Sequence, residues 1–500
     1  MFSLSPDEQP TLLLQNCTLL PDAGGQGLRT SLDISIVGQT IQQIGPAGSI
    51  PVSGHTRVID ASGMLVVPGL LNGHTHSPEN LLKATIPPLP LELWGLTLFS
   101  SFVEWTPRLT YLSTLLGAIE MLKGGTTATL DHLWTADGIA GEHLSAAMQA
   151  YRDAGIRASV APMIEDRDLL IEFGQEHGIE FPSHPFSDRF ELWSSMDEQL
   201  ATLEAFMDQW HLQGDGRLRC LLGPNGVQWC SSSLLESCLK LADRYETGLH
   251  LHALETQLQT RIIKRMLGTG GIRYLHDMGV LRPGTSLAHC IWVEPGDLEI
   301  IAESGATVIH NPVSNMRLGS GIFPLEEARR AGVRVALGSD GSASNDTQNV
   351  YGALKLAGLL HNNAYVDYAQ WPKAEHLWSV ATIGGREALG YHRGEIGELA
   401  PGRLADLVLL DLNAMPFFPL RDPYLHLVYC EPAQAVHTVI VNGQVVVEQQ
   451  RMVTVDEEEV KKEIRERCAN IWPGFEANLE SVPNTRELMQ AFDRLRALDI

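Results

Sequence analysis

The sequence predicts an α/β protein in which a (β/α)8 barrel is accompanied by a small β domain built from both ends of the chain. Three observations predict this fold. The middle of the 500-residue chain alternates apolar, strand-like runs with helix-like stretches, a pattern typical of parallel sheets covered by helices. Both ends carry short strand-like runs with no long helical pattern between them. Histidines and acids stand at the ends of several central runs, where barrel enzymes place their functional side chains.

The first 60 or so residues consist of short strand-like runs separated by turns that contain Gly or Pro, namely TLLLQNCTLL, SLDISIVG, TIQQIG and TRVIDASG. Strand patterns return at 405–412 and 437–453, and Asn442-Gly443 in the second of these is a strong hairpin signal. We therefore expect residues 1–65 and 393–455 to form one small β domain together.

Eight strand-like runs lie between these ends, and we expect residues 66–392 to form the barrel. The runs are 64–76, 126–134, 157–164, 217–226, 247–255, 285–290, 306–315 and 334–341. Helix-like stretches separate them, and several of these end in Gly, as a helix C-terminus often does. The segment 165–216 is too long for a simple loop and predicts extra helices. Residues 456–500 predict a helical tail that packs on the β domain or at a subunit contact.

Charge and cysteine content limit the function classes. A formal net charge of -24 argues against nucleic acid or an anionic membrane as a partner. The seven cysteines are scattered and include no CxxC pair, which indicates reduced thiols. The first ten residues lack an apolar signal-like core, and no apolar stretch reaches membrane-spanning length. We therefore expect a cytoplasmic protein.

The pair His74-Thr75-His76 places two imidazoles on the same side of a strand end, because residues i and i+2 share a face. Such a pair is either half of a metal site or two ordinary polar histidines. Other strand ends favour the metal site, because they carry His250, His252, Glu255, His289 and Asp340. A lone histidine in a strand is more often a core residue, but packing alone does not explain so many groups in barrel order. The sequence thus predicts a metal site at the carboxyl ends of the strands.

Five motifs together resemble the amidohydrolase superfamily, in its deaminase and chlorohydrolase branch: HTH after PGLLN, HLHALET, LAHC, HNPVSNMRLGSGIFP and LGSDGSASND. The resemblance covers nearly the whole chain. It implies a (β/α)8 TIM barrel joined to a small β-sandwich made from both termini. It also implies a metal-dependent hydrolase that acts on carbon–nitrogen bonds other than peptide bonds.

By this resemblance the metal ligands are His74, His76, His252 and Asp340. His252 is preferred over its same-face neighbour His250 because the family's ligand lies three residues before the glutamate, whereas His250 packs or forms a hydrogen bond. Zinc is the first expectation, and the ligand set also suits iron(II). Binuclear relatives bridge their metals with a carbamylated lysine, usually on the fourth strand, but this chain has no lysine in 124–239. We therefore expect one divalent metal ion per chain.

The resemblance also implies catalytic roles for Glu255, His289 and Asp340. Metal-bound hydroxide would attack the amidine carbon of an amino-substituted N-heterocycle of the purine, pterin or triazine type. His289 would orient or deprotonate the water, Glu255 would protonate the ring nitrogen, and Asp340 would pass a proton to the departing ammonia. The same hydroxide could instead release chloride or an alkylamine or open a cyclic amide. A third interpretation is a non-catalytic scaffold.

Candidate substrate contacts follow from looser matches. Glu104 falls close to a glutamate that contacts the sugar in related nucleoside deaminases, or it is a surface acid. Trp94 and Trp105 either form an aromatic wall for a planar ring or pack their loop. Asn225 stands where relatives often carry a ring-contacting histidine, which predicts altered ring recognition. Pro162 stands about where adenosylhomocysteine-type deaminases have a carboxylate-binding arginine, which argues against that substrate. We expect a small heterocyclic molecule as the substrate, and barrels of this kind often form homo-oligomers.

Overall fold

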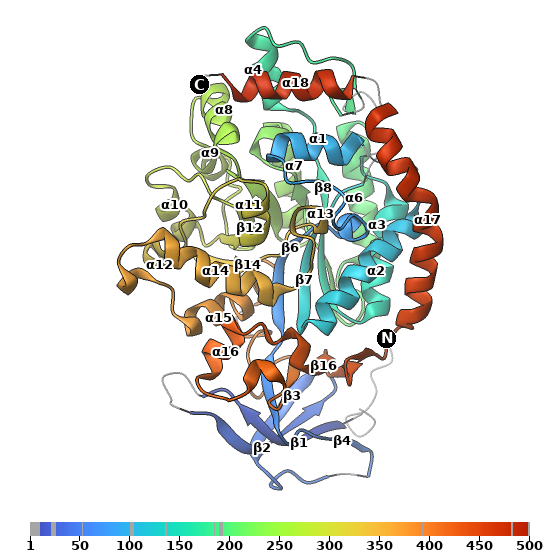
Figure 1. Cartoon of the computed structure of the whole chain (residues 1–500), viewed down its shortest axis with the longest axis vertical. Coiled ribbons are helices and arrows are strands. Elements are labelled where there is room, and N and C mark those ends of the chain that lie inside the picture. Colours follow the sequence, from blue (N-terminus) through green and yellow to red (C-terminus); the bar gives the residue numbers. More distant parts are fainter. Residues whose placement is uncertain are drawn as a thin grey trace.

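Strands from the two ends of the chain are hydrogen-bonded into one nine-stranded sheet at one end of the molecule (Figure 1). The computed structural model describes residues 11–21, 27–52, 54–100, 105–135, 138–184, 186–189, 194–392, 394–481 and 484–498. The sheet order is β18-β17-β16-β15-β5-β1-β2-β3, with β4 paired to β1. The strands are β1 (Thr11–Leu19), β2 (Arg29–Val37), β3 (Thr40–Pro46), β4 (Thr56–Asp60), β5 (Met64–Pro68), β15 (Leu407–Asp411), β16 (Val436–Val441), β17 (Gln444–Glu448) and β18 (Arg451–Met452).

Two pairings hold this terminal sheet together. The antiparallel pair β5–β15 joins its N-terminal strands to its C-terminal strands. Between β16 and β17, Asn442 and Gly443 have φ values of 54° and 75°. These are the positive angles that a two-residue hairpin requires, which explains the Asn-Gly sequence.

The first apolar run of the central region contributes to two sheets. Its first half is β5 of the terminal sheet, and its second half is β6 (Leu70–Thr75), the strand that leads to the His-x-His pair. Gly69 separates them, and a Cβ at this position would lie 2.0 Å from Thr127 Oγ1. Only glycine lets the backbone approach its neighbour so closely. The terminal sheet therefore extends to Pro68, slightly past the expected boundary at residue 65.

The central strands form two parallel sheets, ordered β10-β8-β7-β6 with β9 paired to β8, and β11-β12-β13-β14. The strands are β7 (Thr126–Leu133), β8 (Arg157–Ile164), β9 (Leu218–Cys220), β10 (Gly223–Pro224), β11 (Leu249–Ala253), β12 (Thr285–His289), β13 (Thr307–His310) and β14 (Arg334–Leu337). Each predicted central run contains a strand, the fourth as two short pieces. Parallel bridges Leu222–Leu249 and Gly226–His252 link the sheets along one edge. At the other edge the Asp340 N–H donates to the His74 carbonyl over 2.9 Å.

Helices connect the parallel strands and cover their outer side (Figure 1). The connecting helices are α1 (Leu91–Ser100), α2 (Pro107–Lys123), α3 (Gly141–Ala154), α4 (Leu169–Glu176), α6 (Met196–Trp210), α7 (Ser232–Arg244), α8 (Gln257–Leu267), α9 (Gly271–Asp277), α10 (Asp297–Ser304), α11 (Pro312–Arg317) and α12 (Leu325–Ala331). After the last parallel strand come α13 (Ser342–Asn345), α14 (Val350–Ala364) and α15 (Ala374–Thr382), and α16 (Pro423–Tyr429) lies between β15 and β16. The insertion at 165–216 contains α4 and α6, as expected. In the part of the chain that the structure describes, no helix has the length and apolar character needed to cross a bilayer.

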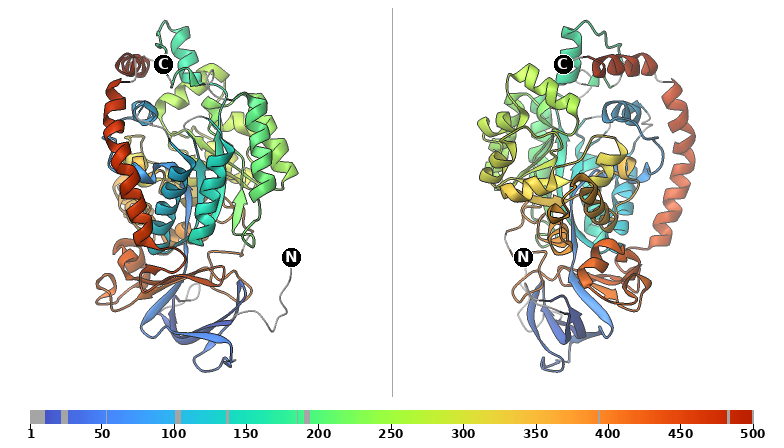
Figure 2. Two further views of the ribbon diagram at one scale, coloured as in Figure 1. Left: turned by 90° about the vertical axis from the view of Figure 1, so that its right-hand side faces the viewer. Right: turned by 60° about the vertical axis from the view of Figure 1, so that its left-hand side comes forward.

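The C-terminal tail forms two helices that link the terminal sheet to the opposite end of the molecule. Helix α17 (Glu457–Ser481) begins beside the sheet, where the Met452 N–H donates to Glu457 Oε1 over 2.9 Å. It then runs along one side of the molecule (Figures 1 and 2). Helix α18 (Thr485–Arg496) lies over α1, near the carboxyl ends of the parallel strands (Figure 1). Its buried face includes Leu488, Phe492 and Leu495.

Candidate metal and substrate site

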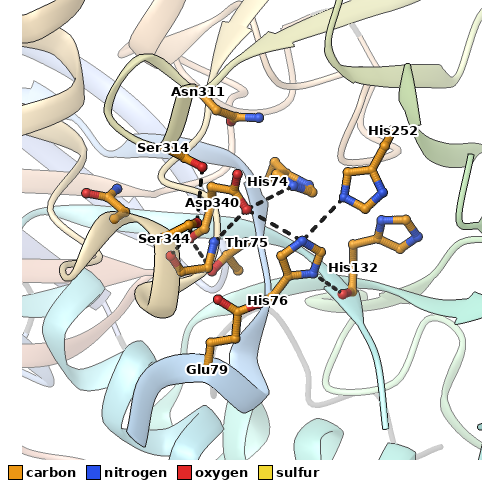
Figure 3. Close-up of polar contacts among 12 residues, drawn as sticks. His74, Thr75, His76, Glu79, His132, His252, Asn311, Ser314, Asp340 and Ser344 are labelled. Atoms are coloured by element: carbon orange, nitrogen blue, oxygen red, sulfur yellow. Dashed lines mark hydrogen bonds and ion pairs between the residues drawn. The ribbon is translucent and has the colours of Figure 1, made fainter. Parts of the chain in front are cut away.

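The carboxyl ends of the parallel strands bring His74, His76, His252 and Asp340 together in a buried cluster (Figure 3). Asp340 Oδ1 lies 3.4 Å from His74 Nε2 and 3.5 Å from His76 Nε2, and the Nε2 atoms of His76 and His252 are 3.3 Å apart. In a tetrahedral zinc site with bonds of about 2.0–2.1 Å, neighbouring ligand atoms lie roughly 3.3–3.4 Å apart. These three spacings therefore suit a single small metal ion.

Two of the histidines are oriented by bonds from their other ring nitrogen to the backbone. His76 Nδ1 lies 2.7 Å from the His132 carbonyl oxygen, and His252 Nδ1 lies 2.8 Å from the Asn225 carbonyl oxygen. A carbonyl only accepts, so each Nδ1 carries the hydrogen and donates it. Each Nε2 is thereby left with a lone pair that can bind a metal, as is usual for metal-binding histidines whose other ring nitrogen donates a hydrogen bond.

His74 is oriented by another histidine. Its Nδ1 lies 2.8 Å from Nε2 of His250, and Nδ1 of His250 lies 2.7 Å from the Ser286 hydroxyl oxygen. Nε2 of His74 is buried and has no hydrogen-bond partner among the described residues. Buried polar atoms are rarely left without a partner unless they bind a group of another kind. The structure thus gives His250 the hydrogen-bonding role expected of it.

Two residues of the cluster have unusual backbone angles. His289, the last residue of β12, has φ of 76°, and Asp340, which follows β14, has φ of 66°. Left-handed conformations are uncommon and strained for residues other than glycine and collect at functional sites. The Gly341 N–H donates to Asp340 Oδ1 over 2.7 Å and holds the carboxylate in place.

His289, Glu255 and Asp340, three groups that can accept or donate a proton, lie close together in this cluster. His289 Nε2 lies 3.5 Å from Glu255 Oε2 and 3.8 Å from Asp340 Oδ2. Burial raises the pKa of Glu255 to about 7, so this carboxyl group can act as an acid near neutral pH. Burial alone would raise the pKa of Asp340 too, but His74 and the other nearby imidazoles hold it well below its usual value. The two carboxyl groups are thus tuned in opposite directions, as acid and base pairs often are.

A cavity that is partly open to solvent lies next to these groups, with about 880 Å³ of empty space when the open part is included. His76, His252, His289, Glu255 and Asp340 line its floor, and apolar side chains line much of the rest.

The residues predicted to contact the substrate differ in where the structure places them. Trp94 lines the cavity, and its Nε1 donates to the Ala343 carbonyl over 3.2 Å. Trp105 is not among the described residues that line the cavity. It packs in an apolar cluster with Leu109 and Cys468, because the start of α2 faces the tail helix α17. It also packs against the apolar cluster that contains Trp94 and Trp134, and its contact with a planar ring stays a prediction. Glu104 lies outside the described residues.

Asn225 lines the cavity, but both ends of its amide are held by the protein. Its Oδ1 lies 3.0 Å from His252 Nδ1, and its Nδ2 donates to Glu165 Oε2 over 2.7 Å. Asn225 therefore orients His252, and its recognition of the substrate ring stays a prediction.

Two buried residues of the site were not singled out by the sequence. His132, near the end of β7, forms a group with His74 and His252 in which the possible ligand atoms all lie within 4.8 Å of one another. His74, His289 and Asp340 form a second group of this kind. The sequence signal that could have identified His132 is its position near the end of the second central run. Glu79 accepts bonds from Trp134 Nε1 at 3.3 Å and from the Ala343 N–H at 3.1 Å. Burial raises its pKa to about 7.

Comparisons with known proteins agree on the chain's relatives. The Amidohydrolase family model matches residues 65–446. A 5-methylthioadenosine/S-adenosylhomocysteine deaminase of Pelotomaculum thermopropionicum is 32% identical over 462 residues, which cover 92% of this chain and 98% of that protein. An atrazine chlorohydrolase of Arthrobacter aurescens TC1 complexed with zinc has a TM-score of 0.81 at 27% identity, covering 91% and 99% of the two chains. An adenosine deaminase of Xanthomonas campestris with bound zinc has a TM-score of 0.80 at 25% identity, covering 92% and 98%.

Proposed function

This chain belongs to the amidohydrolase family, and on that premise we propose that it is a hydrolase that removes the amino group of an N-heterocycle and releases ammonia. The observation that carries the proposal is the buried His74–His76–His252–Asp340 cluster with the acid Glu255 beside it. Similar proteins are named as deaminases of adenosine-type compounds and as a triazine chlorohydrolase. A purine nucleoside is therefore the first substrate to test, followed by pterins and triazines.

We propose that His74, His76, His252 and Asp340 hold one divalent ion, with zinc first and iron(II) as the alternative. The donor spacings and the unpartnered Nε2 of His74 support this assignment. The absence of lysine from 124–239 supports one ion rather than a lysine-bridged pair. When bound, such an ion supplies the Lewis acidity that makes water a nucleophile near neutral pH.

Side chains of the protein would then orient the water and transfer its protons. His289, whose Nδ1 lies 2.8 Å from Asn315 Oδ1, points Nε2 towards Glu255 and Asp340 and can orient the attacking water. Glu255 would donate a proton to the ring nitrogen beside the attacked carbon, so that negative charge does not build up there. Asp340 would accept the proton of the water and pass it to the amino group. A C–O bond forms, the C–N bond breaks, and ammonia leaves.

A second candidate is the same hydrolysis with another leaving group, such as chloride or an alkylamine, or the opening of a cyclic amide. The resemblance to the zinc-complexed atrazine chlorohydrolase favours keeping this candidate.

Ammonia release from a panel of aminopurine nucleosides, pterins and triazines, measured with zinc-loaded enzyme, tests the proposal. The matched control is His74→Ala, which should lose both zinc and turnover. Turnover of chloro- or amide analogues without ammonia from any amino compound would replace the first candidate by the second.

We further propose that the two parallel sheets close into one (β/α)8 barrel, with residues 66–392 as the barrel, 1–65 and 393–455 as a β-sandwich and 456–500 as a tail. The links between the sheets at both edges support closure. The seven free cysteines fit a reducing, cytoplasmic location. A homo-oligomer stays a prediction.

A further inference from the structure

Four aromatic rings form a continuous band along the wall of the cavity. The band consists of Trp134, Phe99, Phe186 and Phe492, all of which line the cavity. Ring centroids are 5.5 Å apart for Phe99–Trp134, 5.5 Å for Phe99–Phe186 and 6.1 Å for Phe186–Phe492, within the range of favourable aromatic pairs. The four rings come from parts of the chain as distant as the end of β7 and α18.

The cavity wall offers no uncommitted positive charge in the described part of the chain. Arg189 is the one lysine or arginine among the described lining residues. It is buried, and its Nε donates to Glu165 Oε1 over 2.6 Å while Nη2 donates to Asp168 Oδ2 over 2.9 Å. Its Nη1 donates to the Phe186 carbonyl over 2.8 Å. One guanidinium thus faces two carboxyl groups, so a carboxylate on the substrate would meet repulsion and lose its hydration without a partner.

The C-terminal helix holds the last ring of the band in place. Phe492 lies on the buried face of α18, and Arg496 Nη1 of the same helix lies 3.4 Å from Glu92 Oε2 of α1. Glu92 Oε1 accepts a hydrogen bond from Oγ1 of Thr256 over 2.8 Å, and Thr256 is the residue that follows Glu255 in the chain. The helix α18 is therefore bound directly to α1 and, through Glu92 of α1, to the segment that carries the candidate acid.

We propose that the aromatic band is a subsite for an uncharged, apolar substituent of the heterocycle, and that α18 completes it through Phe492. This inference rests on the proposed function and adds the class of substrate. It separates two thioethers that share one ring, because the sulfur of 5-methylthioadenosine carries a methyl group whereas the sulfur of S-adenosylhomocysteine carries a charged amino-acid group.

The first test compares kcat/KM of the zinc-loaded, full-length enzyme for methylthioadenosine, adenosine and S-adenosylhomocysteine by ammonia release. Burying one or two extra apolar groups predicts that methylthioadenosine exceeds adenosine by roughly tenfold. The charged group predicts that it exceeds S-adenosylhomocysteine by at least about 100-fold. Equal values for methylthioadenosine and S-adenosylhomocysteine would overturn the proposal.

The second test changes the band itself. Phe492→Ala should reduce the preference for methylthioadenosine over adenosine by at least about fivefold, whereas Phe492→Leu should retain most of it. Phe181→Ala is the matched control, because Phe181 packs on Phe492 with centroids 5.5 Å apart but is not among the described lining residues. Phe99→Ala, at a partly exposed position, tests the same wall independently of the tail. An unchanged preference in both Phe492→Ala and Phe99→Ala contradicts the proposal.

Calorimetric binding to the zinc-loaded Glu255→Gln variant separates this inference from the proposed function. If the wild type releases no ammonia but this variant binds methylthioadenosine far more tightly than S-adenosylhomocysteine, the subsite stands and the deaminase proposal fails. If the wild type deaminates all three compounds equally well, the function stands and the subsite is wrong.

Discussion

Nδ1 of His74 lies 2.8 Å from Nε2 of His250, and this contact belongs to a chain of bonds that ends at a backbone carbonyl, which can only accept. His74 donates from Nδ1, and His250 in turn donates from Nδ1 to the Ser286 hydroxyl, which lies 3.4 Å from the Leu249 carbonyl oxygen. The lone pair of His74 Nε2 is thereby directed towards Asp340. His250 and His252 share a face of β11, but His250 contacts His74, whereas Nε2 of His252 lies 3.3 Å from Nε2 of His76 in the proposed metal site.

His250→Ala should weaken zinc binding by about 10- to 100-fold, the usual effect of removing a hydrogen-bond partner of a metal-binding histidine. Competition with a chromophoric chelator measures this affinity. His250→Gln retains a hydrogen-bond acceptor and should recover part of the loss. Wild-type zinc affinity in His250→Ala would show that the contact with His74 has no effect on the metal.

Glu255→Gln should retain zinc and lose at least about 100-fold in kcat, because a glutamine amide keeps the shape of the carboxylic acid but cannot donate its proton. Atomic emission measures whether the variant retains zinc, and ammonia release from the same sample measures the loss of kcat. Loss of zinc from this variant would mean that Glu255 is a ligand rather than the acid.

Activity should fall as pH rises above about 7. Burial raises the pKa of Glu255 to about 7, and only the protonated form can act as the acid. The protonated fraction, and with it kcat/KM, should drop about tenfold per pH unit on the alkaline side. A kcat/KM profile from pH 5 to 9 tests this, with Glu255→Gln expected to lack that limb. A wild-type plateau extending to pH 9 excludes Glu255 as the acid.

Arg157→Ala should destabilise the protein by about 3–5 kcal/mol, because it leaves a buried carboxylate without its partner. Arg157 pairs with Asp406 through Nε, and its Nη2 donates to Asp406 Oδ1 over 3.0 Å and to Asn442 Oδ1 over 2.7 Å. Thermal unfolding followed by circular dichroism measures the loss. The double variant Arg157→Met with Asp406→Leu should lose less than Arg157→Ala alone. A Tm of Arg157→Ala equal to that of the wild type contradicts the expectation.

The order of strands and most of the candidate metal cluster could be predicted because both depend on local sequence. Period-two spacing places His74 and His76 on one face, and the end of each apolar run marks where a side chain meets the centre. The same period cannot separate His250 from His252, because both lie on one face of β11. Their difference arises from contacts with His74 and His76, which come from a distant strand.

The wall of the cavity could not be predicted in the same way. Phe492 and Arg189 stand in segments without strand motifs, and their places depend on how α18 and the chain after α4 pack. The packing of Trp105 could not be predicted, because aromatic residues in a loop after the first strand can pack in either direction. His132 was not predicted, because a histidine within an apolar run is usually a core residue.

Because β5 pairs with β15, the terminal sheet cannot be completed until most of the chain has been synthesised. The N-terminal strands can pair among themselves early, but β5 acquires its second neighbour only when Leu407–Asp411 has emerged. At roughly 5–20 residues per second, the intervening chain takes on the order of 20–70 seconds to make. Throughout that interval the nascent polypeptide exposes an unpaired sheet edge, the kind of surface that invites aggregation. Slower translation between these two strands should therefore lower the soluble yield of an otherwise stable enzyme.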